Sequence, residues 1–139
     1  MKVASVVIVV LAIAIAVVPM FTDCESAGRT LTLADGRQVA MKCHWTARAE
    51  LGLGLPLMAV GLMMGFSRRR EARRFLGIGG TTLGALAILL PTELIGVCAN
   101  PDMPCVSAMK PALILMGALV VGVSLATVAV SWGREVEQA

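Results

Sequence analysis

Four long apolar stretches alternate with short polar segments along the chain. The apolar stretches cover residues 3–21, 46–66, 75–95 and 108–132, and the polar segments cover 22–45, 67–74 and 96–107. Each apolar stretch approaches or exceeds the roughly 20 residues that a helix needs to cross a bilayer. The pattern predicts an all-α membrane protein, with one domain over residues 1–139 that forms a bundle of four transmembrane helices.

Composition supports a lipid environment for these helices. Hydrophobic residues make up 58% of the chain and charged residues only 15%, whereas soluble domains have about 25% charged residues. The first apolar stretch follows Lys2 and has the general form of a signal peptide. It is long enough to span the membrane, and its exit, Val-Pro-Met-Phe-Thr-Asp, has no small-x-small cleavage site. We therefore expect a retained first helix.

The first polar segment contains a hairpin pattern. Residues 30–33 (Thr-Leu-Thr-Leu) and 38–41 (Gln-Val-Ala-Met) flank Ala-Asp-Gly-Arg at 34–37. An Asp-Gly pair between alternating segments is a strong signal for a two-residue turn in which both turn residues have positive φ. The sequence predicts a small β-hairpin that lies on the membrane face as a cap. A disulfide between Cys24 and Cys43 would hold its base.

Charge sets the expected orientation. Segment 67–74 contains five arginines between two apolar stretches, and short loops rich in Lys and Arg stay in the cytoplasm. We expect a multi-pass protein of the plasma (inner) membrane with both termini cytoplasmic. The arginines would contact anionic lipid headgroups, and no nucleic-acid binding is expected.

All four cysteines fall in the two polar segments on the predicted outer side, and none falls in a predicted helix. Because extracytoplasmic compartments are oxidising, disulfides are expected there. Pairing within each loop gives Cys24–Cys43 and Cys98–Cys105. Four cysteines allow three connectivities, and the sequence does not choose between them.

Small and charged residues mark two further candidate sites. Gly61 with Gly65, and Gly80 with Gly84, form GxxxG patterns that indicate close helix contacts, with each other or with foreign helices. Charged residues near the outer helix ends predict an interfacial network or, alternatively, a ligand or ion vestibule. This outer polar cluster comprises His44, Arg48, Glu50, Glu93 and Lys110.

Two segments carry a resemblance to a known family. Met-Lys-Cys-His-Trp-Thr-Ala-Arg-Ala-Glu at 41–50 opens one predicted helix, and Gly-Val-Cys-Ala-Asn-Pro-Asp-Met-Pro-Cys at 96–105 precedes another. With these segments the chain resembles an uncharacterised family of small four-helix membrane proteins of bacteria and archaea, a domain of unknown function. Members of that family are often encoded near ABC transporters of the macrolide-exporter type. The resemblance implies a possible partner and no activity.

The sequence contains no complete catalytic motif, so we expect no enzymatic activity, no cofactor and no assigned metal ion. The favoured role is a structural or interaction subunit, bound to a membrane protein such as an ABC-type transporter or to copies of itself. One alternative is a membrane thiol–disulfide oxidoreductase, although neither cysteine pair has Cys-x-x-Cys spacing. Another is soft-metal (copper) handling at the outer face, because the outer loops and adjacent helix starts hold residues that suit Cu(I): Met41, Cys43, His44, Cys98, Met103, Cys105 and Met109. Small-molecule transport by the chain alone is the fourth class.

Overall fold

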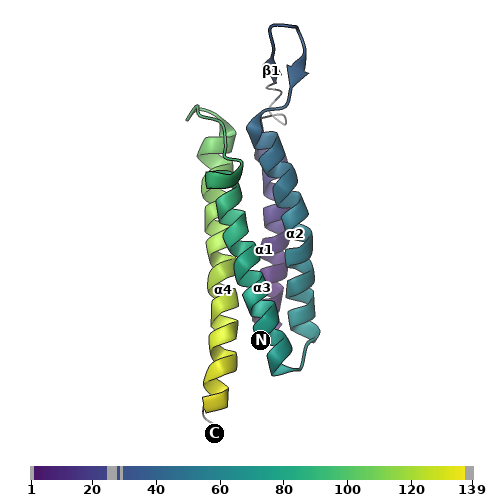
Figure 1. Ribbon diagram of the computed structural model, residues 1–139, viewed down its shortest axis with the longest axis vertical. Helices are drawn as coiled ribbons and strands as arrows, with labels where there is room; N and C mark the ends of the chain where they lie inside the picture. Colours follow the sequence, from purple (N-terminus) through teal and green to yellow (C-terminus); the bar gives the residue numbers. More distant parts are fainter. Residues whose placement is uncertain (1, 25–27, 29, 137–139) are drawn as a thin grey trace.

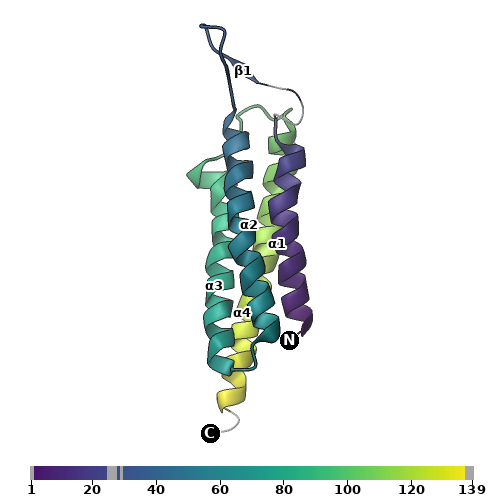
Figure 2. The same ribbon diagram turned by 90° about the vertical axis from the view of Figure 1, so that its right-hand side faces the viewer.

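The computed structural model describes residues 2–24, 28 and 30–136, with side chains up to residue 133. Its long helices are α1 (Lys2–Thr22), α2 (Lys42–Phe66), α3 (Arg70–Leu89) and α4 (Lys110–Val136). Two π-helical turns, η1 (Leu90–Leu94) and η2 (Cys105–Met109), continue α3 and lead into α4. The helices lie side by side along one axis (Figures 1 and 2). All four are long and apolar enough to cross a membrane, which confirms the predicted helical bundle.

Two helices begin earlier than the apolar pattern suggests. α2 starts at Lys42, and the helical turn before α4 starts at Cys105. Apolar periodicity locates the lipid-facing part of a helix, but a helix continues through polar residues where no Gly or Pro stops it, and none lies between 42 and 46. Cys43 and Cys105 therefore sit in the first turns of helices, and the expectation that no cysteine lies in a helix is wrong.

Small residues bring the helices together as two pairs. A Cβ built on Gly54 of α2 would lie 2.7 Å from the Cβ of Ala16 on α1, and the Ser5 hydroxyl of α1 donates a 2.6 Å hydrogen bond to the carbonyl of Gly61 on α2. In the other pair, a Cβ on Gly117 of α4 would lie 2.9 Å from the carbonyl oxygen of Gly84 on α3. Such close approach between backbones requires glycine at these positions.

The GxxxG glycines face neighbours inside these pairs. Gly61 and Gly65 lie against α1, and Gly80 and Gly84 lie against α4. The two patterns do not face one another. Gly61, Gly80 and Gly84 are buried by these contacts within one chain, whereas Gly65 is exposed.

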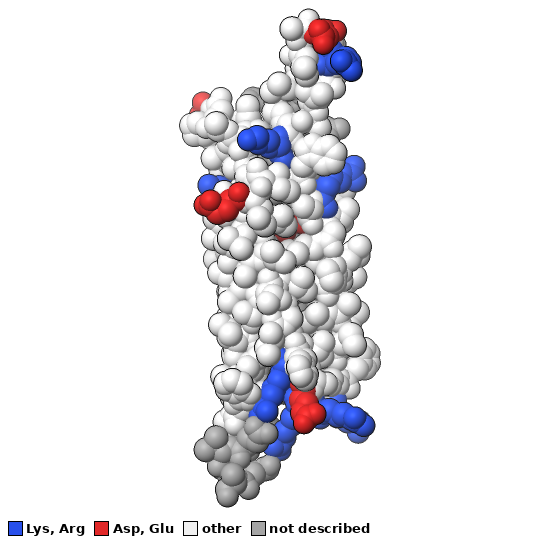
Figure 3. All heavy atoms as spheres, viewed as in Figure 1, with Lys and Arg blue, Asp and Glu red and all other residues white. Residues whose placement is uncertain are grey.

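Apolar side chains fill the centre of the bundle and also cover its outside. Ile8, Ile15, Leu57, Leu113 and Val120 are fully buried. Many other apolar residues are exposed, as expected for helices whose outer faces contact lipid. Figure 3 shows charged groups gathered towards the two ends, with a largely uncharged band between them.

The predicted hairpin is present but smaller than expected. β1 (Leu31–Thr32) pairs antiparallel with β2 (Gln38–Val39), and both strands are exposed. The strands extend beyond the end of the bundle (Figure 1). They are not pinned by a disulfide, so the predicted disulfide-held cap is not formed. Residues 25–27 and 29 of the same segment lie outside the described residues.

The hairpin turn also differs from the two-residue type. The amide of Gly36 donates to the carbonyl of Leu33 at 2.9 Å, and the amide of Leu33 donates to the carbonyl of Arg37 at 2.9 Å. Only Gly36 has positive φ, at 77°, whereas Asp35 does not. In a turn of this type only the last residue, here Gly36, needs a left-handed conformation. A non-glycine residue is therefore tolerated at the position of Asp35.

Candidate metal centre

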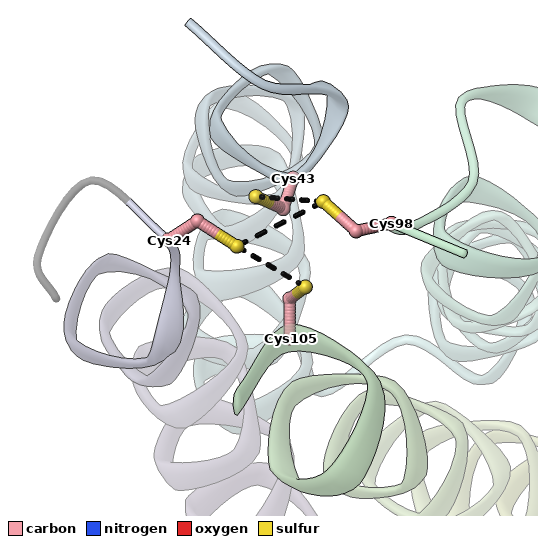
Figure 4. A group of neighbouring side chains, drawn as sticks. All are labelled: Cys24, Cys43, Cys98 and Cys105. Carbon is pink, nitrogen blue, oxygen red and sulfur yellow. Dashed lines mark hydrogen bonds between the residues drawn. The ribbon is translucent and has the colours of Figure 1, made fainter. Parts of the chain in front are cut away.

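Four cysteines meet at the end of the bundle that carries the hairpin. Cys24 follows α1, and Cys43 is the second residue of α2. Cys98 lies in the loop after η1, and Cys105 is the first residue of η2. Figure 4 shows their sulfur atoms pointing toward one another from four separate chain segments. We call this group the four-cysteine cluster.

The sulfur atoms are close but unbonded. The Sγ atom of Cys24 lies 3.3 Å from that of Cys105 and 3.8 Å from that of Cys98, and the Sγ atoms of Cys98 and Cys43 lie 3.6 Å apart. All four Sγ atoms lie within 4.8 Å of one another. A disulfide bond is about 2.05 Å long, and all four cysteines are free.

The two loop-local disulfides predicted from sequence are therefore absent, and the structure corrects that prediction. The helices carry both cysteine-bearing segments to the same end of the bundle. There, each cysteine of one segment contacts a cysteine of the other segment. Sequence proximity within a loop gave no information on this contact.

A glycine turn positions Cys98. The amides of Ile95 and Gly96 both donate to the carbonyl of Leu90 at 3.1 Å, and Gly96 adopts a φ of 77°. A left-handed glycine of this kind ends a helix and reverses the chain. The hydroxyl of Thr46 on α2 donates a 2.8 Å hydrogen bond to the carbonyl of Gly96. This bond fixes the turn against α2, two residues before Cys98.

Burial disfavours the charged form of the Cys24 thiol. Cys24, Cys43 and Cys105 are fully buried, and Cys98 is half-buried. Burial, together with the neighbouring thiols, raises the pKa of Cys24 far above that of an ordinary thiol. Cys43 and Cys105 occupy first helical turns, where exposed amides and the helix dipole favour negative charge. The cluster therefore has two positions that suit thiolates once a cation supplies the opposing charge.

Two thioethers extend the sulfur environment. The Sδ atom of Met103 lies 3.9 Å from the Sγ atom of Cys24, and the Sδ atom of Met41 lies 3.9 Å from the Sγ atom of Cys98. Met109, which was also considered from sequence, is fully buried in the core near this end.

The predicted outer polar cluster does not form one network. Arg48 and Glu93 are exposed, and Lys110 is half-buried. Nδ1 of His44 lies 3.7 Å from a carboxylate oxygen of Asp23, an interaction that the sequence did not suggest. Among the described residues, no ion pair joins Glu50 or Glu93 to either cation.

Glu50 lies deeper than the sequence suggests. Its side chain is fully buried, and neither carboxylate oxygen has a hydrogen-bond partner among the described residues. It follows Cys43 by seven residues, so the two share a helix face. Cys43, Ala47 and Glu50 are all buried. The apolar pattern could not distinguish this buried position from an interfacial one.

Exposure predicts the order in which the thiols react. In the metal-free, reduced protein, N-ethylmaleimide should modify Cys98 first, because its side chain is the only half-buried one of the four. Cys24, Cys43 and Cys105 should react only as the bundle opens. Timed quenching followed by peptide mass spectrometry measures the order. Equal rates for all four thiols in the folded protein would contradict the described packing.

The fold and the cluster together define a class: a bundle of four helices, each long and apolar enough to cross a membrane, with four cysteines gathered at one end. The chain belongs to the family described as "Domain of unknown function (DUF4418)", whose model matches residues 4–130. The uncharacterised family expected from the sequence is thus confirmed, while the association with transporters stays a prediction. No curated protein and no solved structure matches the chain.

Proposed function

We propose that this protein is a membrane protein that binds one soft metal ion through its four-cysteine cluster. The observation that carries the proposal is the convergence of four unbonded Sγ atoms, all within 4.8 Å of one another, from residues far apart in the sequence. An ion with bonds of about 2.3 Å to four tetrahedral sulfurs holds those sulfurs about 3.8 Å apart. The contacts of 3.3, 3.6 and 3.8 Å lie near that separation.

The donor set selects the kind of ion. The cluster supplies only sulfur, and thiolates favour Zn(II), Cu(I) or iron over the oxygen-seeking ions Mg(II) and Ca(II). Each thiol that becomes a ligand releases its proton. The bound cation would then offset the negative charge of the buried thiolates.

The location favours an ion taken up outside the cytoplasm. The cluster lies where α1 ends and α2 begins, whereas the arginines of segment 67–74 lie in the α2–α3 connection and the first turns of α3, at the opposite end of the bundle (Figure 2). Under the positive-inside rule, that connection is cytoplasmic and the cluster faces outward. The protein would then sit in the plasma membrane with both termini inside.

A role as an interaction subunit, favoured by the sequence, stays a prediction. A transporter partner or a homo-oligomer remains compatible with the exposed apolar helix faces. The glycine patterns offered in its support are directed to contacts within the chain.

Metal analysis of purified protein tests the proposal. Protein reduced and stripped of metal in detergent should bind one Zn(II) or Cu(I) ion per chain, and X-ray absorption should find only sulfur neighbours. Replacing Cys43 or Cys105 by serine removes a ligand. The affinity for the metal should fall by more than about 10–100-fold, which is the loss seen when a group that only supports a ligand is mutated. Ala99→Ser, which puts the same hydroxyl at an exposed position beside Cys98, is the matched control.

Two results would overturn the proposal. One is a reduced wild-type protein that binds neither ion. The other is an ion whose neighbours are oxygen or nitrogen, with affinity that is unchanged by the cysteine substitutions.

A further inference from the structure

An open groove leads from the surface to the four-cysteine cluster. It has a volume of about 510 Å³ and lies between the hairpin side, with Leu31 and Val39, and the α3–α4 loop, with Asn100. Met41, Cys98 and Met103 also line it. The groove therefore reaches the one cysteine of the cluster that is not fully buried.

Sulfur atoms form a continuous path from this groove into the cluster. Met41 contacts Cys98 at 3.9 Å, and Met103 contacts Cys24 at 3.9 Å. Cys98 in turn lies 3.6 Å from Cys43, and Cys24 lies 3.3 Å from Cys105. An ion held at either thioether would lie one ligand exchange away from a cysteine.

We propose that this groove is the entrance of the site and that its two methionines admit Cu(I) in preference to Zn(II). The inference rests on the proposed metal-binding function and adds the identity of the ion and its route. Thioethers bind Cu(I), whereas Zn(II) in proteins is bound by thiolate, imidazole and carboxylate ligands.

The chemistry of the groove walls supports that selection. Most of its lining is apolar, and Lys42 is the only charged group among the described residues that line it. A hydrated divalent ion would lose water there without gaining an anionic ligand, and Lys42 would repel it. Univalent Cu(I) pairs with neutral thioethers at lower electrostatic cost. Transfer to Cys98 exchanges one sulfur ligand for another and releases the thiol proton, with no change in the oxidation state of the metal.

Volume-conserving substitutions test the route. In the metal-free full-length protein, Met41→Leu with Met103→Leu keeps the apolar bulk and removes both thioethers. The rate of Cu(I) transfer from a bathocuproine complex should fall by about tenfold, the lower end of the range for mutation of groups that support metal ligands. Final Cu(I) stoichiometry and the rate of Zn(II) uptake should not change. Met58→Leu, on α2 outside the groove, should load Cu(I) at the wild-type rate.

The outcomes separate this inference from the function on which it rests. A double variant that loads Cu(I) at the wild-type rate, or that loads both ions more slowly by the same factor, overturns the route while leaving a metal site in place. A wild-type protein that binds neither ion overturns the proposed function itself. Unchanged final stoichiometry in the variant shows that its cluster has formed.

Discussion

Replacing Gly117 by valine should destabilise the bundle by about 1–3 kcal/mol or more, the usual cost of overpacking a filled interior. A Cβ at this position would lie 2.7 Å from Cγ1 of Ile88 and 2.9 Å from the carbonyl oxygen of Gly84. A side chain can rotate away, but the backbone of α3 can yield only if the two helices separate. Because α4 follows directly from η2, the separation should also displace Cys105 and weaken metal binding.

Gly122→Val is the matched control on the same helix. A Cβ there meets no atom within 4 Å, so the variant makes the same change of residue without a clash. Thermal unfolding in detergent and metal stoichiometry should be measured for both variants. Equal loss of stability at the two positions would show that valine itself, and not the helix contact, causes the effect.

Oxidation of the metal-free protein should join the two helix pairs covalently. The contacts of 3.3 Å between Cys24 and Cys105 and of 3.6 Å between Cys43 and Cys98 favour disulfides between these residues, in place of the loop-local pairs. Each bond forms between two sulfurs with loss of two protons and transfer of two electrons to an added oxidant such as diamide. The sulfurs must approach by less than 2 Å to reach the bond length of about 2.05 Å. Bound metal should block the reaction, because the sulfur lone pairs that would react with the oxidant are then bound to the metal.

Cleavage of the chain between α2 and α3 distinguishes the two disulfide connectivities. A specific protease site inserted in the α2–α3 connection, at residues 67–69, allows the chain to be divided into two halves. After oxidation and cleavage, the halves should remain together on a denaturing gel without reductant and separate with it. A Cys24→Ser, Cys43→Ser double variant retains only the Cys98–Cys105 possibility, so its halves should separate in both gels. Separation of the wild-type halves would restore the loop-local pairing.

The bundle could be predicted from sequence because each helix has its own apolar pattern. Length and hydropathy are local properties, and Asp35-Gly36 likewise marked the hairpin within a few residues. The start of α2 was harder to predict, because its first residues are mostly polar and nevertheless helical. Glycine spacing indicated that Gly61 and Gly80 make close contacts, but the identity of the partner helix depends on how the bundle closes.

The cluster could not be predicted because it depends on contacts between distant segments. Cys24 and Cys105 are 81 residues apart and become neighbours only when α4 packs beside the end of α1. The sequence did contain one usable signal: all four thiols were expected at the same end of four parallel or antiparallel helices. The positive φ of Gly96, which turns Cys98 toward α2, and the burial of Glu50 both follow from tertiary packing.

The spread of the cysteines along the chain has a consequence for biogenesis. Synthesis proceeds from the N-terminus, so Cys24, Cys43 and Cys98 emerge before Cys105, and α4 follows last. The four-cysteine cluster cannot assemble until Cys105 and the start of α4 have joined the other helices. A partly assembled chain would leave its thiols open to oxidants, whereas under the proposed function capture of an ion would mark a chain whose assembly is complete.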